Sequence, residues 1–324
     1  ETDGNAISNY LGSKYQAISV GRVMTCVMGM VVRREREIRE FVKTPFYRVL
    51  GSFSAGGHPF DGEWRAVEGS RYFGSPYLYK ENGFKERKHA EELKAILSAD
   101  PPFKAVVEKI EKKKENKNPP LLFNLAELQN ECSRLFKISP DETLKIVQEL
   151  YEKKLVTYPR TDARVLSTAV AKEIQKNIGG LRGYVHGKPF AEEILAEGSY
   201  KNLAKTRYVN DKQITDHYAI IPTGQGMGAL GSLHPSAAKV YETVVRRFLS
   251  IFYPPAVYQK VSIVSVIQKE RLFSSFKILV SEGYLKVVQN SFAKKKEESA
   301  QEEGEQTEDT SFLEILPVSY THLT

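Results

Sequence analysis

The stretch Tyr258–Val288, YQKVSIVSVIQKERLFSSFKILVSEGYLKVV, carries the pattern on which the expected fold depends. Apolar residues recur within it with a period of two: Val261, Ile263, Phe276, Ile278 and Val280. Such alternation predicts β-strands with one buried face. A β-rich region is therefore expected towards the C-terminal end of the sequence.

A second strand-like region lies nearer the N-terminus. Phe46–Tyr79 is rich in aromatic residues, glycine and β-formers, with turn signals at Gly56-Gly57 and Asp61-Gly62, which predicts short antiparallel strands. Between the two regions, Leu125–Phe248 shows helical periodicity broken by short loops. The sequence thus predicts an α+β, multidomain fold in which a helical domain is inserted into a β-rich domain.

Two runs of low hydrophobicity are expected to lie outside the domain cores. Glu111–Asn118 (EKKKENKN), followed by Pro119-Pro120, predicts a linker between the β-rich and helical segments. Lys294–Asp309 is charged and rich in Glu and Gln, which predicts a solvated loop or disordered insert.

The composition limits the class of protein. The 324 residues include 47 Lys and Arg against 40 Asp and Glu, a formal charge of +7 that fits a nucleic-acid partner but equally an ordinary basic surface. The 17 Tyr and 16 Phe exclude disorder throughout, and no stretch approaches the ~20 apolar residues of a transmembrane helix. Cys26 and Cys132 cannot form a disulfide framework or a four-thiolate zinc site, and without a secretion signal a reducing cytoplasm is expected.

Apolar residues at helical spacing predict a helix over Val23–Phe41, with a charged outer face stabilised by i,i+4 ion pairs. Arg22 lies at the start of this helix beside Gly21. Backbone amides and a guanidinium can jointly hold a phosphate at such a position.

The sequence indicates three helix starts in the central region. Asn124, Ser139 and Ser167 are the candidate caps, and Ser139 forms a capping box with Glu142. The first two helices, joined through Lys137-Ile138, predict a helix-turn-helix. Two helices packed in a core and a DNA-reading motif both fit this pattern.

The run LVTYPRTD, Leu155–Asp162, places a tyrosine at the end of a short β-like stretch. Tyr158 can attack a phosphodiester if its proton is removed or shared, because a free phenol ionises only near pH ~10. Arg160 can bind the oxygens of the attacked phosphate through its guanidinium fork, with Thr161 and Asp162 orienting that fork. From these residues alone, a packed aromatic side chain at a turn is the alternative interpretation.

A second candidate site is the run TDHYAIIPT, Thr215–Thr223. His217 can act as a charged phosphate ligand, since the neighbouring carboxylate of Asp216 favours the imidazolium form. A structural histidine is the alternative. The glycines at 224, 226, 228 and 231 do not follow a strand and open a helix, so a flexible loop is expected there instead of a phosphate cradle.

Three motifs in this order resemble those of type IA DNA topoisomerases, in particular the bacterial topoisomerase III group: Ser19–Thr25 (SVGRVMT), Leu155–Asp162 and His217–Thr223 (HYAIIPT). The resemblance spans residues 17–316. It implies an ATP-independent isomerase that cuts and reseals one DNA strand and passes another strand through the break.

The resemblance also implies residue roles. Tyr158 matches the tyrosine that takes the 5′ phosphate of the cut strand, and Arg160 matches the arginine that steadies the scissile phosphate. His217 matches a histidine that contacts DNA phosphate near the cleavage point, and Arg22 matches an arginine of the single-strand groove. The other expected DNA contacts are Ser19, Thr25, Thr161 and Asp162.

By the same resemblance the fold is a toroidal core. Residues 1–40 would belong to a single-strand-groove domain, 41–118 and 249–316 would form the two halves of a β-rich arch, and 119–248 would form the inserted tyrosine domain. Residues 317–324 do not continue the family pattern and are expected to be a foreign tail.

Family members bind Mg²⁺ through an acidic cluster in a domain that precedes the first motif. This sequence shows no such cluster, so the metal ligands are expected outside the chain and the isolated chain is expected to be inactive. Met24 also departs from the glutamine of many relatives, which weakens the expectation of a polar base contact there. The expected partner is DNA, chiefly single-stranded. The protein is expected to be monomeric, cytoplasmic and nucleoid-associated. No membrane partner is expected, and a helicase partner is left open.

Two other classes of protein fit parts of the sequence. A non-catalytic helix-turn-helix protein would use the two capped helices to bind nucleic acid. A recombinase or relaxase would also use a tyrosine nucleophile, but a recombinase needs several separated Arg and His partners around a C-terminal Tyr. A relaxase needs a metal-binding His cluster, which the 6 scattered histidines do not supply.

Overall fold

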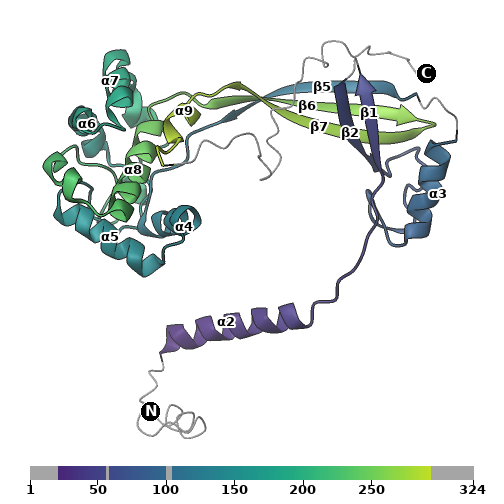
Figure 1. Cartoon of the computed structure of the whole chain (residues 1–324), viewed down its shortest axis with the longest axis horizontal. Helices are drawn as coiled ribbons and strands as arrows, with labels where there is room; N and C mark the ends of the chain where they lie inside the picture. The colour runs from purple at the N-terminus through teal and green to yellow at the C-terminus, as the bar shows by residue number, and fades with distance from the viewer. Residues whose placement is uncertain (1–20, 56–57, 100–103, 293–324) are drawn as a thin grey trace, which may run out of the picture. The chain divides into compact units, whose positions relative to one another are not determined.

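The structure is a computed structural model that describes residues 21–55, 58–99 and 104–292, without the side chains of Arg22 and His58. The chain divides into two compact units (Figure 1). The first comprises Glu1–Val49 and Arg65–Pro101, and the second comprises Leu50–Trp64 and Pro102–Thr324. Ser19 and residues 294–309 and 317–324 lie outside the described residues, and the division into a groove domain, a two-part arch and a tyrosine domain stays a prediction.

The first unit contains a long helix and a small hairpin packed on a helix. Its elements are α2 (Arg22–Arg39), β3 (Leu78–Lys80), β4 (Gly83–Phe84) and α3 (Arg87–Leu97). The N-terminal helix predicted from the sequence is confirmed, and Glu35–Arg39 forms the expected type of i,i+4 ion pair. The hairpin and α3 bury Phe84 and Leu93, both completely inaccessible to solvent.

The second unit contains a five-stranded sheet with the strand order β1-β2-β7-β6-β5. The strands are β1 (Leu50–Ala55), β2 (His58–Arg65), β5 (Val106–Lys117), β6 (Ala256–Ile267) and β7 (Glu270–Ser281). Adjacent β5, β6 and β7 pair antiparallel, as do β1 and β2. The predicted alternation is confirmed at Val261, Ile263 and Phe276, which are buried, but not at the end of β7, where Ile278 is half-buried and Val280 is exposed. The strand pattern ends earlier than expected, because Leu285–Val288 forms the short helix α9.

The linker predicted at Glu111–Asn118 is wrong, because β5 continues through Lys117. Its backbone pairs with β6 along its length, with Glu111 opposite Ser262 and Lys117 opposite Ala256. The strand lies at the sheet edge, where charged side chains remain in water and disfavour pairing with another chain. Backbone pairing therefore makes a strand out of a run that has no apolar pattern.

The turn predicted at Asp61-Gly62 is also wrong, because both residues lie inside β2. Gly62 pairs with Gly51, and a Cβ on Gly62 would lie 2.9 Å from the Phe53 ring. Glycine is thus required at this position by close packing and not by turn geometry. The other predicted turn, at residues 56–57, lies outside the described residues.

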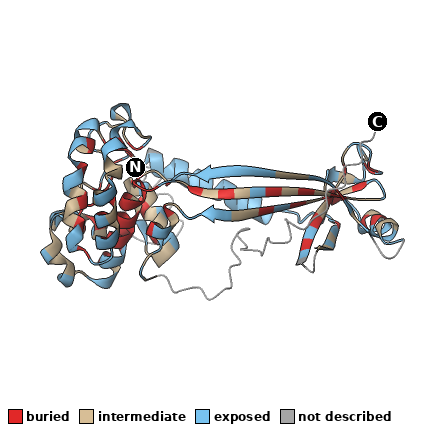
Figure 2. Cartoon of the chain, turned by 90° about the horizontal axis from the view of Figure 1, so that it is seen from above, coloured by how far each residue is buried: buried red, intermediate tan, exposed pale blue. Residues whose placement is uncertain are grey.

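The helices of the second unit surround one core. They are α4 (Leu125–Phe136), α5 (Pro140–Glu152), α6 (Thr168–Gly180), α7 (Lys188–Glu197) and α8 (Pro235–Ser250), with short 3-10 turns η1 (Leu181–Gly183), η2 (Ser199–Lys205), η3 (Asp211–Gln213) and η4 (Met227–Ser232). Buried residues concentrate among these helices (Figure 2). Along α8, Val240, Tyr241, Val244 and Phe248 are fully buried, so this helix forms the centre of the core.

The predicted helix starts are confirmed as local hydrogen bonds. Asn124 accepts from the amide of Glu127, Ser139 from that of Glu142, and Ser167 from that of Val170. Lys137, with a φ of 60°, turns the chain between α4 and α5. None of the helices in the described ranges is long and apolar enough to cross a membrane.

Candidate active site

The tyrosine and histidine motifs lie side by side although about sixty residues separate them in the sequence. The Thr157 amide donates to the carbonyl of Ile221 at 3.0 Å, and the Thr223 amide donates to that of Leu155 at 3.0 Å. Val156 forms an isolated antiparallel bridge with Pro222. The expected β-like stretch before Tyr158 is therefore confirmed as an extended segment paired to the histidine motif.

Side-chain hydroxyls reinforce this pairing. The Thr157 hydroxyl donates to the carbonyl of Ala219 and accepts from the amide of Ile221, each at 3.0 Å. The Thr161 hydroxyl donates to the carbonyl of His217 at 2.8 Å and accepts from the Ala163 amide at 3.1 Å. Each buried bond of this type contributes about 0.5–1.5 kcal/mol net, and several together fix the register of the two segments.

Burial alternates along the tyrosine segment. Pro159, Thr161 and Ala163 are buried, whereas Arg160 and Asp162 are exposed and Tyr158 is half-buried. The Thr161 amide donates to the Pro159 carbonyl at 3.0 Å, so the chain makes a tight turn at Arg160. Arg160 and Asp162 thus face solvent, whereas Thr161 faces inward.

The Tyr158 ring lies against the exposed imidazole of His217. The ring centroids are 4.3 Å apart with an interplanar angle of 39°. Tyr151 also meets Tyr158 edge to face, with ring centroids 5.5 Å apart. The phenol ring thus has two aromatic neighbours and remains partly exposed.

Tyr158 and His217 both line a surface cavity of about 490 Å³. Lys154 and Glu152 are its other ionisable residues besides tyrosines, so one cation and one carboxylate face the same space. Tyr218 also lines the cavity, and burial raises the pKa of its hydroxyl. An open cavity beside a half-exposed phenol gives a phosphodiester room to reach the Tyr158 oxygen.

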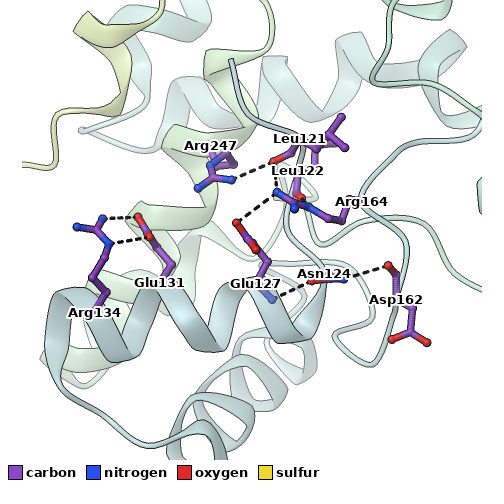
Figure 3. Close-up of polar contacts among 9 residues, drawn as sticks. All are labelled: Leu121, Leu122, Asn124, Glu127, Glu131, Arg134, Asp162, Arg164 and Arg247. Atoms are coloured by element: carbon purple, nitrogen blue, oxygen red, sulfur yellow. Dashed lines mark hydrogen bonds and ion pairs between the residues drawn. The ribbon is translucent and has the colours of Figure 1, made fainter. Parts of the chain in front are cut away.

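A polar scaffold supports the segment that follows Tyr158 (Figure 3). The Asn124 side chain caps α4 and also donates to the carbonyl of Asp162 at 3.0 Å, while the Asp162 carboxylate points away from Asn124. Arg164 donates to the carbonyl of Leu122 at 3.1 Å and pairs with Glu127 at 3.3 Å. The N-terminus of α4 is thereby fixed to the tyrosine segment.

The loop after the histidine motif approaches α6 closely. Gly224 has a φ of +77°, and a Cβ there would lie 2.6 Å from the carbonyl oxygen of Asn177. A Cβ on Gly180 would lie 2.0 Å from the carbonyl oxygen of Gly224. The loop expected from the glycines thus includes a tight contact with α6, and η4 follows it.

The structure brings some of the expected site residues together and leaves others apart. Tyr158 and His217 meet, whereas Arg160 is not among the described residues that line their cavity. Thr161 is directed inward to His217. Thr25 lies on exposed α2, in the first compact unit, where its hydroxyl donates to the Gly21 carbonyl at 3.0 Å.

Several lining residues were not expected from the sequence. Tyr151, near the end of α5, is 39% exposed and lines the cavity. Lys154, Tyr218 and Gln225 also line it. The adjacency of Tyr218 to His217 was the one available signal, because the other residues enter the site only through the pairing of the two segments.

The described residues do not fit a metal ion. Within the described ranges, no group of three or more His, Cys, Asp or Glu side chains is placed to hold a metal. No step of the chemistry below is therefore assigned to a metal bound by this chain.

Comparison with known proteins gives consistent matches. A family model described as DNA topoisomerase matches residues 3–316. DNA topoisomerase 3 of Bacillus licheniformis is 30% identical over 299 residues, covering 92% of this chain and 38% of that protein. DNA topoisomerase 3 of Shouchella clausii is 31% identical over 311 residues, covering 95% of this chain and 37% of that protein. The chain thus spans less than two-fifths of the length of these curated relatives.

A solved structure shares the fold. Full-length topoisomerase I from Thermotoga maritima matches with a TM-score of 0.58 and 25% sequence identity, covering 93% of this chain and 45% of that one. The structural match therefore extends over the sheet and the helices together.

Proposed function

The chain belongs to the DNA topoisomerase family, and on that premise we propose that it is the tyrosine-bearing part of a type IA enzyme. Tyr158 is the proposed nucleophile. The observation that carries the proposal is that Tyr158 and His217 lie ring to ring at one open cavity, with centroids 4.3 Å apart.

The proposed reaction is a transesterification. The Tyr158 oxygen attacks the phosphorus of a DNA phosphodiester, a tyrosine–phosphate bond forms, and the bond to the 3′ oxygen breaks. The phenolic proton is transferred in the process, and a proton reaches the leaving 3′ oxygen, so a free 3′ hydroxyl results. One phosphodiester replaces another of similar energy, so cutting and resealing need no ATP.

Two neighbouring groups support the phosphate in this proposal. His217 lies beside the phenol and can donate a hydrogen bond to a phosphate oxygen in the cavity. Arg160 is exposed two residues after Tyr158 and makes no hydrogen bond or ion pair within the described part of the chain. Its guanidinium is thus available for the charge that develops on the attacked phosphate.

Strand passage requires more than this chain in the proposal. The relatives are more than twice as long, and the type IA pattern places Mg²⁺ on acidic ligands elsewhere in the whole enzyme. We therefore expect the 324-residue chain alone not to relax DNA. Mg²⁺-dependent relaxation by this chain alone would contradict that expectation.

The proposed substrate is single-stranded DNA, bound by a monomeric enzyme in the cytoplasm at the nucleoid. The exposed cation Lys154 and the aromatic rings of Tyr151 and Tyr158 at the cavity suit backbone phosphates and stacked bases. Binding should therefore be sensitive to salt and tolerant of sequence.

The alternative function, a non-catalytic helix-turn-helix binder, is not favoured by the charges of α5. The first turn of this helix carries exposed Asp141 and Glu142. In a DNA-reading helix the N-terminal residues approach the bases and phosphates, where two carboxylates are repelled.

Trapping of a covalent adduct tests the proposal. The gene product that contains this chain is incubated with a single-stranded oligonucleotide and stopped with denaturant. A 3′-end label should become attached to the protein, and a 5′-end label should be released with the free 3′ hydroxyl fragment. Tyr158→Phe should abolish the adduct and retain single-strand binding, with Tyr151→Phe as the matched control that still forms it. An adduct that survives Tyr158→Phe would refute the proposal.

A further inference from the structure

A second, larger cavity of about 1190 Å³ lies in the same unit as the candidate active site. Its lining includes the end of β5, the segment that leads to α4, and residues of α4, α8 and α9. We call it the arginine cavity, and the lining residues used below are Lys117, Phe123, Arg134, Arg247, Tyr284 and Asn290. Among the described residues it shares none of its lining with the cavity at Tyr158.

Arg247 is the unusual residue of this cavity. Its guanidinium carbon lies 4.0 Å from the centroid of the Phe123 ring, and its Nη1 donates to the carbonyl of Leu121 at 3.0 Å (Figure 3). Among the described residues no carboxylate lies within ion-pair distance of it. Burial lowers the pKa of this guanidinium, and the more distant carboxylates of Glu131 and Glu127 partly oppose that shift.

The other cationic side chains of the cavity differ in whether a carboxylate pairs with them. Arg134 pairs with Glu131 at 2.9 Å, and Arg246 pairs with Glu242 in the core. Lys117 is exposed at the end of β5, with no carboxylate partner within the described ranges. Within the described residues neither Arg247 nor Lys117 has a carboxylate at ion-pair distance, a condition that favours an anionic ligand.

The rest of the lining is partly apolar. Phe123 and Tyr284 are only 1% and 4% exposed, so the accessible apolar surface comes from the half-buried side chains of Leu135, Leu285 and Val288. The amide oxygen of Asn290 has no hydrogen-bond partner within the described residues. At about 1190 Å³ the cavity is larger than a lone phosphate needs and exceeds the ~300–1,000 Å³ typical of small-molecule sites, so it has room for a nucleotide.

We propose that the arginine cavity binds a nucleoside phosphate, with the phosphate on Arg247 and Lys117 and the base against the apolar wall. The ligand is either a free nucleotide or the phosphorylated end of a DNA strand. This site goes beyond the proposed strand cleavage, since it uses neither Tyr158 nor His217. Because its walls include two of the segments that connect the helices with the sheet, the one from β5 to α4 and the one from β7 to α9, a bound ligand would hold those segments to α4 and α8.

Calorimetric titration of the 324-residue chain tests this proposal. The probes are dTMP, inorganic phosphate, and a dT tetranucleotide with or without a 5′ phosphate. We expect saturable binding of dTMP that weakens about 10-fold or more in Arg247→Gln, because a charge-assisted bond to phosphate is lost. Lys117→Gln should weaken it in the same direction. The exposed cation Lys145 on α5 does not line the cavity, so Lys145→Gln is the matched control and should bind as the unchanged protein does.

The probes distinguish the two possible ligands, a free nucleotide and the phosphorylated end of a DNA strand. Tighter binding of the 5′-phosphorylated tetranucleotide than of dTMP identifies a strand end, and equal binding identifies a free nucleotide. If Arg247→Gln fails to fold, Lys117→Gln decides, because its side chain is exposed. Absence of saturable dTMP binding, or loss of binding in Tyr158→Phe and His217→Ala with no change in Lys117→Gln, would overturn the proposal. Neither of those results bears on the adduct experiment, so the two proposals fail separately.

Discussion

The hydroxyl of Thr161 donates a 2.8 Å hydrogen bond to the main-chain carbonyl of His217, and this bond joins the two candidate catalytic motifs. Thr161 is 7% exposed and also accepts from the Ala163 amide. A residue expected to contact DNA is thus placed as a support for its neighbours. Removing the Thr161 hydroxyl should therefore affect the position of His217 without changing Tyr158 itself.

Replacing Thr161 with valine should destabilise the second unit. Thr161→Val keeps the shape of the side chain but leaves the His217 carbonyl and the Ala163 amide without their partner, at a cost of about 1–3 kcal/mol. Denaturant unfolding measures the change, and hydrogen exchange at the Ala163 amide should become faster. Thr215→Val is the matched control, since Thr215 is exposed, and it should change stability by less than about 0.5 kcal/mol. Equal effects of the two substitutions on stability would contradict the role of Thr161 as a support for His217 and Ala163.

Gly224 should not tolerate a side chain. Its φ of +77° is strained for other residues, and a Cβ would lie 2.6 Å from the Asn177 oxygen. Gly224→Ala should therefore cost about 1–3 kcal/mol or more and shift the adjacent Thr223 away from Leu155. Gly231→Ala, where a Cβ would meet nothing within 4 Å, should leave the unfolding midpoint nearly unchanged. A tolerated Gly224→Ala would mean that this contact with α6 is not required.

Two buried tyrosines should respond in opposite ways to loss of their hydroxyl groups. The Tyr241 hydroxyl is buried without a partner among the described residues, whereas that of Tyr208 donates to the Pro119 carbonyl at 2.7 Å. Tyr241→Phe should be neutral or stabilising by about 1 kcal/mol, and Tyr208→Phe should be destabilising by about 1–2 kcal/mol. Thermal and denaturant unfolding of the two variants measure the sign of each change in stability. Destabilisation by Tyr241→Phe would reveal a partner for that hydroxyl.

Stability should fall at alkaline pH through the same tyrosine. Burial raises the pKa of Tyr208 to about 12, against about 10 for a phenol in the unfolded chain. Since the folded-state pKa is the higher one, this stabilisation is complete below pH ~10 and is lost as the pH rises towards 12. The loss from Tyr208 should be about 1.4 kcal/mol per pH unit in that window. Denaturant titrations from pH 8 to 11 should show a shallower decline in Tyr208→Phe, and identical slopes would contradict the burial of this group.

The two thiols should differ sharply in reactivity. Cys26 is exposed on α2, whereas Cys132 is fully buried in α4 and burial raises its pKa to about 12. A thiolate is the reactive form, so a disulfide reagent should modify Cys26 rapidly and Cys132 only as the helices open. Absorbance of the released thiol follows both phases. In Cys26→Ser the fast phase should vanish, and a remaining fast phase would show that Cys132 is accessible.

Features that depend on contacts a few residues apart could be predicted from the sequence. The caps at Asn124, Ser139 and Ser167 bond to amides three positions later, and the alternation at Val261 and Ile263 follows from the period of a strand. The order of the motifs also indicated the family that the comparisons confirm. None of these features requires knowledge of how distant segments pair.

Features that depend on distant partners became apparent from the three-dimensional fold. Glu111–Lys117 became a strand because β6 supplies its hydrogen bonds, and Gly62 is needed because the Phe53 ring approaches it. Tyr151 became a wall of the cavity because Tyr158 and His217 are held together by bonds across about sixty residues. The backbone groups of a charged run must form hydrogen bonds, and the rest of the fold determines which groups they bond to. The same holds for the contacts of rings at the edge of a core. Neither set of partners can be predicted from the local sequence pattern.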